Sequence, residues 1–315
     1  METLLSIKPT SKISNSMSDI KSQEKLSKDD QIDSEIDKLI EWLKIMPHLP
    51  NINDREWLKN CYIGRKCRLE RTKESLNGYF CCRATMNEFF GVRDPLGDDI
   101  QTAMRKTWFG FCNNLTDEGY QVLVVKNMTD VDVPGRYLDY WVKYYYMSMD
   151  LNFKTISVKG VIIIYDMSIA NKNEILTQMT PTFLRNSLDA SSYFPYKLIQ
   201  VHFVNAPSYS TTIFNLLKTL VTKKIQSRIF MHQDPANLLK YIPKHCIPSD
   251  YGGEEKSIKE LGEHNKQCVL AEKDLFLNGL FSLKADMEKK PVDTNSNEQS
   301  KMFGFDGNFK KLNID

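Results

Sequence analysis

The sequence lacks a long hydrophobic run. No window of its 315 residues approaches the ~18 consecutive apolar residues of a membrane-spanning helix. The first residues, METLLSIKPTSKISNS, also lack the apolar segment that a signal peptide needs. We therefore expect a cytoplasmic protein rather than a secreted or membrane-spanning one.

A strong charge of one sign and paired cysteines are also missing. The 42 basic and 40 acidic residues give a formal net charge of +2, which argues against a protein that neutralises nucleic-acid phosphates over a wide surface. Seven cysteines, an odd number without a CxxC pair, favour reduced thiols over a zinc ribbon or a secreted disulfide framework. We expect no nucleic-acid partner, no metal and no other cofactor.

The common signatures of catalysis are absent as well. The sequence has no GxGxxG, GxxxxGK[ST], HExxH or GxSxG motif and no EF-hand loop. Asp166 ends an apolar run, as catalytic carboxylates of α/β enzymes do, but no nucleophile or base accompanies it, which favours a loop-capping role. We expect no catalytic residue; an enzyme that acts on a hydrophobic substrate around Asp166 and His202 is the alternative.

The apolar pattern divides the chain into four parts. Residues 1–30 and 284–315 are rich in polar residues and poor in apolar periodicity, so we expect a disordered N-terminal segment and a flexible C-terminal tail. Across residues 31–96, apolar residues recur three and four apart, which predicts a small all-helical N-terminal domain. Residues 97–283 alternate strand-like runs with helical patterns and predict an α/β domain.

The α/β part contains short apolar runs that look buried on both faces. These runs are VLVVKN (122–127), KGVIIIYDMS (159–168), LIQVHFVN (198–205) and RIFMH (228–232), with helical patterns at about 134–150, 173–189 and 208–224 between them. Such an alternation predicts a mixed, largely parallel sheet with flanking helices.

The stretch LLKTLVTKKIQSRI, residues 216–229, joins an apolar stripe to two cations. If the segment is one helix, Ile213, Leu217 and Val221 lie on one side, and Lys224 and Arg228 continue the same line. The two cations either compensate the dipole at the C-terminal end of a helix or bind an anion. Spacing alone does not separate these two interpretations.

Several motifs carry a family resemblance. The segments Gly160–Asp166, Tyr193–Lys197, Val201–Pro207 and Ile247–Gly253 follow the order and spacing of the CRAL-TRIO lipid-binding domain. Upstream, Gly64-Arg-Lys-Cys-Arg-Leu-Glu-Arg71 resembles the arginine-bearing turn of the helical domain that precedes it. Within the family, the chain is most similar to the branch around the alpha-tocopherol transfer protein and cellular retinaldehyde-binding protein.

The resemblance implies an intracellular carrier. Members of this family enclose one small hydrophobic ligand, such as a retinoid, a tocopherol-like molecule or another lipid, under a mobile gate helix and transfer it between membranes. The gate helix maps to about residues 208–223. In this branch, a basic cluster beside the gate can receive a phosphoinositide headgroup at an anionic membrane surface. The matching positions are Arg65, Lys197, Lys224 and Arg228.

A lipid cavity needs apolar walls and few polar anchors, because each unpaired buried polar group costs about 1 to 3 kcal/mol. Alternating strand residues, the gate stripe and the aromatic helix 137–150 supply such walls. The residues that we expect to bind the ligand are Tyr140, Tyr144, Met147, Val161, Ile163, Met179, Phe183, Val201, Phe203, Ile213, Phe214, Leu217 and Val221.

Each wall residue also suits an ordinary core, and Tyr140 and Tyr144 also suit packing against the N-terminal helices. We expect a monomeric carrier. The alternative is an interaction module of the same fold that senses phosphoinositides without transferring a ligand.

Overall fold

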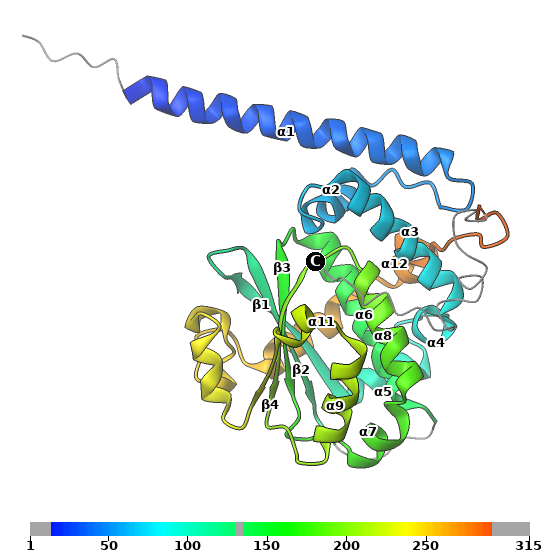
Figure 1. The fold of residues 1–315 in the computed structure, drawn as a ribbon, viewed down its shortest axis with the longest axis vertical. Coiled ribbons are helices and arrows are strands. Elements are labelled where there is room, and N and C mark those ends of the chain that lie inside the picture. The colour runs from blue at the N-terminus through cyan, green and yellow to red at the C-terminus, as the bar shows by residue number, and fades with distance from the viewer. Residues whose placement is uncertain (1–13, 130–134, 292–315) are drawn as a thin grey trace, which may run out of the picture.

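Figure 1 shows the protein as a computed structural model that describes residues 14–129 and 135–291, with side chains described from residue 29 onward except that of Ile213. A group of helices precedes and covers part of a five-stranded sheet. The mixed α/β fold behind a helical N-terminal region, predicted from the sequence, is confirmed.

The N-terminal region consists of α-helices. These are α1 (Ser14–Ile45), α2 (Arg55–Gly64), α3 (Leu69–Thr85) and α4 (Asn87–Phe90). The start of α2 is set by Asp54, whose side chain accepts a hydrogen bond from the Trp57 backbone N–H. Helix α1 begins at Ser14, inside the segment 1–30 that we expected to be disordered, because its Lys, Glu and Gln residues favour helix without an apolar stripe. Residues 1–13 lie outside the described part.

The sheet has the order β1-β2-β3-β4-β5. Its strands are β1 (Thr107–Leu115), β2 (Tyr120–Asn127), β3 (Gly160–Asp166), β4 (Leu198–Val204) and β5 (Ile229–His232). β1 pairs antiparallel with β2, and every other pair is parallel. The apolar runs predicted β2 to β5, whereas β1 was missed because its sequence, TWFGFCNNL, combines a glycine with two asparagines.

Helices connect the strands and complete the domain. They are α5 (Asp98–Lys106), α6 (Tyr137–Thr155), α7 (Lys172–Gln178), α8 (Pro181–Tyr193), α9 (Ser210–Leu220), α10 (Lys223–Gln226), α11 (Ile258–Ala271) and α12 (Lys273–Leu277), with the 3-10 helices η1 (Pro235–Lys240), η2 (Lys244–Cys246), η3 (Ser249–Tyr251) and η4 (Leu280–Ser282). Pro181 begins α8 and splits the single predicted helix 173–189 in two.

The two faces of the sheet are covered differently. The back face carries Val122, Ile162 and Ile164, which pack in one core with residues of α11 and of the segments η1 to η3. The front face carries Leu123 and Ile163, which belong to a larger core shared with α6, α8 and the N-terminal helices. In Figure 1, α6, α8 and α9 lie together on this front side.

A buried ionic network joins the helical region to the α/β domain. The Asp150 carboxylate of α6 accepts hydrogen bonds from Arg83 Nη2 at 2.6 Å and from Arg93 Nη1 at 2.7 Å. Tyr79 donates a further bond to the same carboxylate at 2.8 Å, and Arg93 also reaches the Phe281 carbonyl. The network ties α3, α6 and the C-terminal segment together in a place that water does not reach.

The C-terminal segment returns to the helical region. The backbone N–H of Ala285 donates to the Phe80 carbonyl at 3.1 Å, and that of Asp286 donates to the His48 carbonyl at 2.8 Å. The first residues of the tail 284–315, which we expected to be flexible, are therefore hydrogen-bonded to other segments. Residues 292–315 lie outside the described residues.

Removal of the Asp150 carboxylate should destabilise the fold strongly. Asp150→Ala leaves two guanidinium groups buried without their counter-charge, so we expect a loss of about 3 to 5 kcal/mol in the free energy of unfolding, measured by urea denaturation. Asp37→Ala, which breaks the exposed pair with Arg55, is the matched control and should cost at most about 1 kcal/mol. Equal losses for the two variants would contradict the role given to the network.

Candidate functional site

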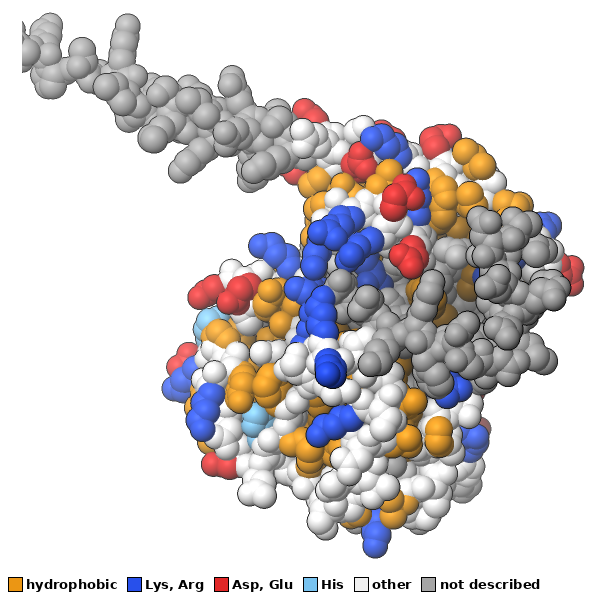
Figure 2. All heavy atoms as spheres, in the orientation of Figure 1, with side chains coloured by type: hydrophobic (Ala, Val, Ile, Leu, Met, Phe, Trp, Pro, Cys, Tyr) orange, Lys and Arg blue, Asp and Glu red, His pale blue; other side chains and the backbone are white. Residues whose placement is uncertain are grey.

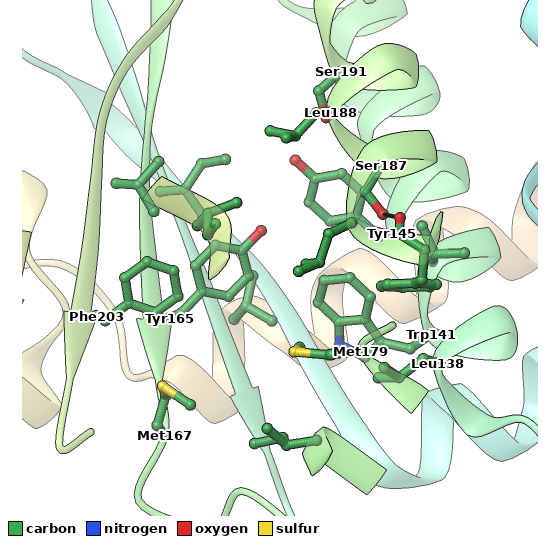
Figure 3. Close-up of a pocket in the computed structure, with 18 of the residues that line it drawn as sticks. Leu138, Trp141, Tyr145, Tyr165, Met167, Met179, Ser187, Leu188, Ser191 and Phe203 are labelled. Carbon is green, nitrogen blue, oxygen red and sulfur yellow. Dashed lines mark hydrogen bonds between the residues drawn. The ribbon is translucent and has the colours of Figure 1, made fainter. Parts of the chain in front are cut away.

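A cavity of about 270 Å³ lies between the front face of the sheet and the helices that cover it. Its walls come from β2, β3 and β4 on one side and from α6, α7, α8, α9 and α10 on the other. Figure 3 shows Tyr165 and Phe203 on the sheet side, facing Trp141 and Leu138 on the helix side. The lining is predominantly apolar, which is typical of pockets for small hydrophobic molecules.

The floor of the cavity follows from the two-residue period of a strand. Ile163 and Tyr165 of β3, with Val201 and Phe203 of β4, point to the front face and line the cavity. Tyr165 and Phe203 are paired in the strand register, and their rings stack with centroids 5.2 Å apart. The flat aromatic pair forms a smooth apolar surface.

Most of the predicted wall residues line the cavity. These residues are Ile163, Met179, Phe183, Val201, Phe203, Phe214, Leu217 and Val221. Ile213 belongs to α9, but its side chain lies outside the described residues.

Four predicted wall residues do not line the cavity. The side of α6 that faces the cavity carries Leu138, Trp141 and Tyr145. Because each residue turns the helix by about 100°, the opposite side carries Tyr140, Tyr144 and Met147, which face away from the cavity. Val161 shares the face of Ile163 but lies two residues earlier on β3, about 7 Å from it, and is packed in the core.

Tyr144 has a different role from the predicted one. Its hydroxyl accepts a hydrogen bond from Asn265 Nδ2 of α11 at 3.3 Å, and its ring packs edge-on against Phe109 of β1. Tyr144 therefore joins α6 to α11 and does not reach a ligand in the cavity.

Sequence reasoning missed other wall residues. They include Val125, Leu138, Trp141, Val142, Tyr145, Tyr165, Met167, Ile175, Leu184, Leu188, Tyr196, Leu198, Ile225 and Ile229. The alternation from Ile163 predicts Tyr165, and the helical step from Leu184 predicts Leu188. The all-round aromatic character of α6 carried no such signal.

Helix α9 covers the cavity and is fastened at both ends. Phe214 packs edge-on against Phe203, with ring centroids 4.5 Å apart. Near its N-terminal end, Tyr209 donates a hydrogen bond to the Ala170 carbonyl at 2.7 Å. Near its C-terminal end, Gln226 Nε2 of α10 donates to the Lys218 carbonyl at 2.8 Å.

Residues 216–229 do not form the one helix on which the in-line arrangement of Lys224 and Arg228 was conditional. Helix α9 ends at Leu220, Val221 is extended, and Thr222 caps α10 by accepting a hydrogen bond from the Ile225 backbone N–H. Lys224 and Arg228 therefore do not continue the stripe of α9 in line. A threonine side chain that can bond the backbone three residues on favours a new helix start.

A basic cluster lies beside this break, where Figure 2 shows Lys and Arg side chains gathered between the helical region and the α/β domain. Burial lowers the pKa of Lys197, and the nearby charges of Lys66 and Arg228 lower it further. Desolvation lowers the pKa of Lys224, with smaller contributions from Arg228 and Lys66. These mutual repulsions define the basic cluster as Lys66, Arg71, Lys197, Lys224 and Arg228.

Arg65 is not part of the exposed cluster. Its side chain is buried, and it donates hydrogen bonds to Ser75 Oγ at 2.9 Å, to the Ser192 carbonyl at 2.7 Å and to the Phe194 carbonyl at 2.6 Å. Burial lowers the pKa of Arg65 to about 10. Arg65 therefore donates hydrogen bonds to carbonyl groups at the C-terminal end of α8. The residues of the basic cluster form the cationic surface.

Gly64 explains why Arg65 reaches so far inward. A Cβ atom on Gly64 would lie 2.1 Å from the Pro195 carbonyl oxygen, so glycine allows α2 to meet the chain after α8 directly. Gly78 of α3 gives the same close approach to the Tyr193 ring, where a Cβ would lie 2.0 Å from a ring carbon.

Asp166 and His202 do not form a common site. Burial raises the pKa of the Asp166 carboxyl, but hydrogen bonds from Asn205, Ser168, Lys126 and Tyr251 outweigh it and hold the pKa below its usual value. His202 points to the back of the sheet, where its Nδ1 lies 2.9 Å from His232 Nε2. This geometry gives Asp166 a structural role at the end of β3.

The described residues contain no candidate metal site and no candidate membrane span. Over residues 14–129 and 135–291, no cluster of His, Cys, Asp and Glu has the composition to hold a metal ion. No helix in the same part of the chain has both the length and the apolar character to cross a membrane.

An α/β domain with an apolar cavity beneath one covering helix has the geometry to hold a small hydrophobic molecule. Residues 106–253 match the family model of the CRAL/TRIO domain, and residues 28–100 match the model described as a Pinta-like UBA domain. The resemblance to the CRAL-TRIO domain that the motifs predict is therefore confirmed for residues 106–253, which are just under half of the chain.

Two curated relatives illustrate the similarity. Clavesin-2 of Homo sapiens is 29% identical over 179 residues, which cover 53% of this chain and 51% of the relative. Clavesin-1 of Xenopus laevis is 32% identical over 100 residues, which cover 31% of this chain and 30% of the relative. The matched region thus spans about a third to a half of the length of these relatives.

A solved structure is similar at a lower level. The crystal structure of Sfh5 has a TM-score of 0.41 and 13% sequence identity, covering 66% of this chain and 74% of that chain.

Substitution of Arg65 should test its structural role. Arg65→Ala leaves buried carbonyls of α8 without a donor and should lower the free energy of unfolding by about 3 kcal/mol in urea denaturation. Arg65→Lys keeps the charge but not the geometry and should also destabilise. Lys66→Ala is the adjacent control, with an expected change within about 0.5 kcal/mol. A stable Arg65→Ala variant would contradict the structural role.

Proposed function

We propose that this protein binds one small hydrophobic ligand, such as a retinoid, a tocopherol-like molecule or another lipid, beneath α9 and transfers it between membranes. The observation that carries the proposal is the apolar cavity of about 270 Å³ on the front face of the sheet. The process is exchange of a bound molecule, without a chemical reaction. The protein would act in the cytoplasm as a monomer and visit membrane surfaces transiently.

Helix α9 is suited to act as the gate. Its inward side chains Phe214 and Leu217, with Val221 just after it, line the cavity. Each such side chain is worth about 1.5 to 3 kcal/mol whether it is buried in protein or in lipid. The closed state in solution and an open state at a membrane would therefore differ little in free energy, and a small bias would select between them.

The basic cluster supplies a source of that bias. Its cations lie beside α10, which is hydrogen-bonded to the end of α9 through Gln226. An anionic membrane attracts such cations by about 1 kcal/mol each near its surface. We propose that a phosphoinositide headgroup binds at Lys197, Lys224 and Arg228, with Lys66 and Arg71 in place of the buried Arg65.

A module that senses phosphoinositides without transfer would have the same basic cluster. It would not need a cavity lined by apolar side chains, because empty apolar space costs stability without contributing to headgroup binding. The cavity therefore favours the carrier.

Filling the cavity should weaken ligand binding. Val201→Trp places a large side chain on the cavity floor and should weaken binding of a fluorescent lipid at least tenfold, measured by titration. Leu239→Trp, on an exposed residue of η1, is the control and should bind as the wild type does.

The two candidate functions give different results in this experiment. A carrier loses lipid transfer between labelled donor and acceptor vesicles when the cavity is filled. Unchanged transfer by Val201→Trp would exclude the cavity as the ligand site, and absence of any bound or transferred lipid in the wild type would favour the sensor.

Charge reversal in the basic cluster should weaken membrane binding. Lys197→Glu with Lys224→Glu replaces two attractions by two repulsions, so flotation with phosphoinositide-containing vesicles should fall more than tenfold at physiological salt. Lys240→Glu with Lys259→Glu changes two exposed cations of η1 and α11 and alters the net charge by the same amount; this control variant should lose much less binding. An equal effect of both changes would indicate general electrostatics rather than a headgroup site.

A further inference from the structure

Ser227 lies at the end of α10, among cations that are close to it in the chain. Lys223 and Lys224 precede it by four and three residues, and Arg228 follows it directly. Ser227 is exposed and forms the C-cap of α10. Its Oγ donates a hydrogen bond to the Lys224 carbonyl at 2.8 Å. The hydroxyl group therefore lies at the surface, in the same helical turn as Lys224.

The folded structure adds cations from other segments. Besides desolvation, which is the largest cause, the charges of Lys66 and Arg228 lower the pKa of Lys197. Desolvation also lowers the pKa of Lys224, and the charges of Arg228 and Lys66 lower it further. Cations that repel one another in this way are stabilised when an anion binds among them. An anion attached to Ser227 would be such a group.

Two other hydroxyl groups near Ser227 in the chain are less suited to modification. Thr222 is buried, and its side chain caps α10. Thr219 of α9 is exposed, but the residues three and four positions before it are uncharged. Ser227 combines an exposed hydroxyl group with basic neighbours on both sides.

We propose that Ser227 is a phosphorylation site, and that its phosphate group blocks the attraction of the basic cluster to anionic membranes. The kinase is one that selects basic residues on the N-terminal side of serine, because an acidic substrate groove complements Lys223 and Lys224. The inference rests on the proposed membrane binding and adds its regulation.

The modification is an ordinary phosphoryl transfer from ATP. The Ser227 Oγ forms a bond to the γ-phosphorus, the bond from that phosphorus to the β–γ bridging oxygen breaks, and ADP leaves. The hydroxyl proton passes to a base of the kinase. The hydrogen bond from Ser227 to the Lys224 carbonyl is lost, because the phosphate ester oxygen has no proton to donate.

The phosphate group opposes membrane binding in two ways. It adds about 1.5 to 2 negative charges at pH 7, which offset the attraction of the cluster to anionic headgroups. Its oxygens also accept charge-assisted hydrogen bonds, so it competes with a headgroup for Lys224 and Arg228. Ser227 is not one of the residues that line the cavity. Ligand binding in solution should therefore be unchanged.

The first experiment tests recognition by a kinase. The full-length protein is incubated with Mg-ATP and the catalytic domain of protein kinase C, and mass spectrometry locates the phosphate. Ser227 should be modified, and Lys223→Ala with Lys224→Ala should slow the modification at least tenfold. Lys240→Ala with Lys244→Ala changes two exposed cations elsewhere and should leave the rate unchanged.

A vesicle arm of this experiment tests whether the membrane and the kinase compete for the same surface. Vesicles that contain a phosphoinositide should protect Ser227 from the kinase, and vesicles of phosphatidylcholine alone should not. A peptide of residues 219–232 serves as the control for kinase activity, because its modification should be the same with either vesicle.

The second experiment measures the effect of the phosphate group. Phosphoserine is incorporated at position 227 by an expanded genetic code, and flotation with phosphoinositide-containing vesicles should fall at least tenfold, while binding of a fluorescent lipid in solution stays unchanged. Phosphoserine at position 249, an exposed serine of η3, adds the same charge and should reduce flotation much less. In a phosphorus NMR titration, the phosphate at 227 should titrate at a lower pH than that at 249, since nearby cations favour the dianion.

The results separate this inference from the proposed function. If the unmodified protein does not bind the vesicles, the proposed headgroup site fails and the inference fails with it. If it binds them but phosphoserine at 227 has no effect, or no more effect than at 249, the headgroup site stands and the switch is overturned. Modification of the peptide without modification of the folded protein would overturn the accessibility of Ser227, and an unmodified peptide would overturn the class of kinase.

Discussion

The cavity depends on keeping the inward sides of α6 and α8 apart from strands β3 and β4. A cavity of about 270 Å³ lined by apolar side chains costs on the order of 6 kcal/mol if it is left empty, so the helices would gain free energy by closing onto the strands. Two sets of buried cations oppose that movement. Asp150 holds α6 between Arg83 and Arg93, and Arg65 holds the C-terminal end of α8 through its carbonyls.

The difference between the two faces of the sheet has the same origin. The back face packs directly on its covering segments in a closed core, whereas the front face is bounded partly by helices that are fixed elsewhere. A bound ligand would fill the space and recover dispersion contacts that the protein alone leaves unused. Its binding would therefore stabilise the closed arrangement of α9 as well as occupying the site.

Sequence patterns predicted the sheet and its front-face residues better than the helices. Side chains along a strand alternate between the two faces of the sheet. Once the β-branched run around Ile163 is recognised as a strand, the residues that share the face of Ile163 can therefore be predicted. Helix α6 is aromatic nearly all round, so no period indicated that Tyr145 faces inward and Tyr144 outward. Arg65 carried a family signal for anion binding, but the close contact of Gly64 with Pro195, which buries Arg65, is a tertiary property. Thr222 was a visible helix-start signal, and the apolar stripe outweighed it.

The close contact at Gly64 also bears on what counts as a domain here. The region that matches the CRAL/TRIO model begins at residue 106. The end of α8, which forms a wall of the cavity, is nevertheless held by the guanidinium group of Arg65, about forty residues before that boundary. A fragment cut at the family boundary would contain every strand and still lose the donors for those carbonyls. The cooperative folding unit is therefore larger than the unit that sequence comparison recognises.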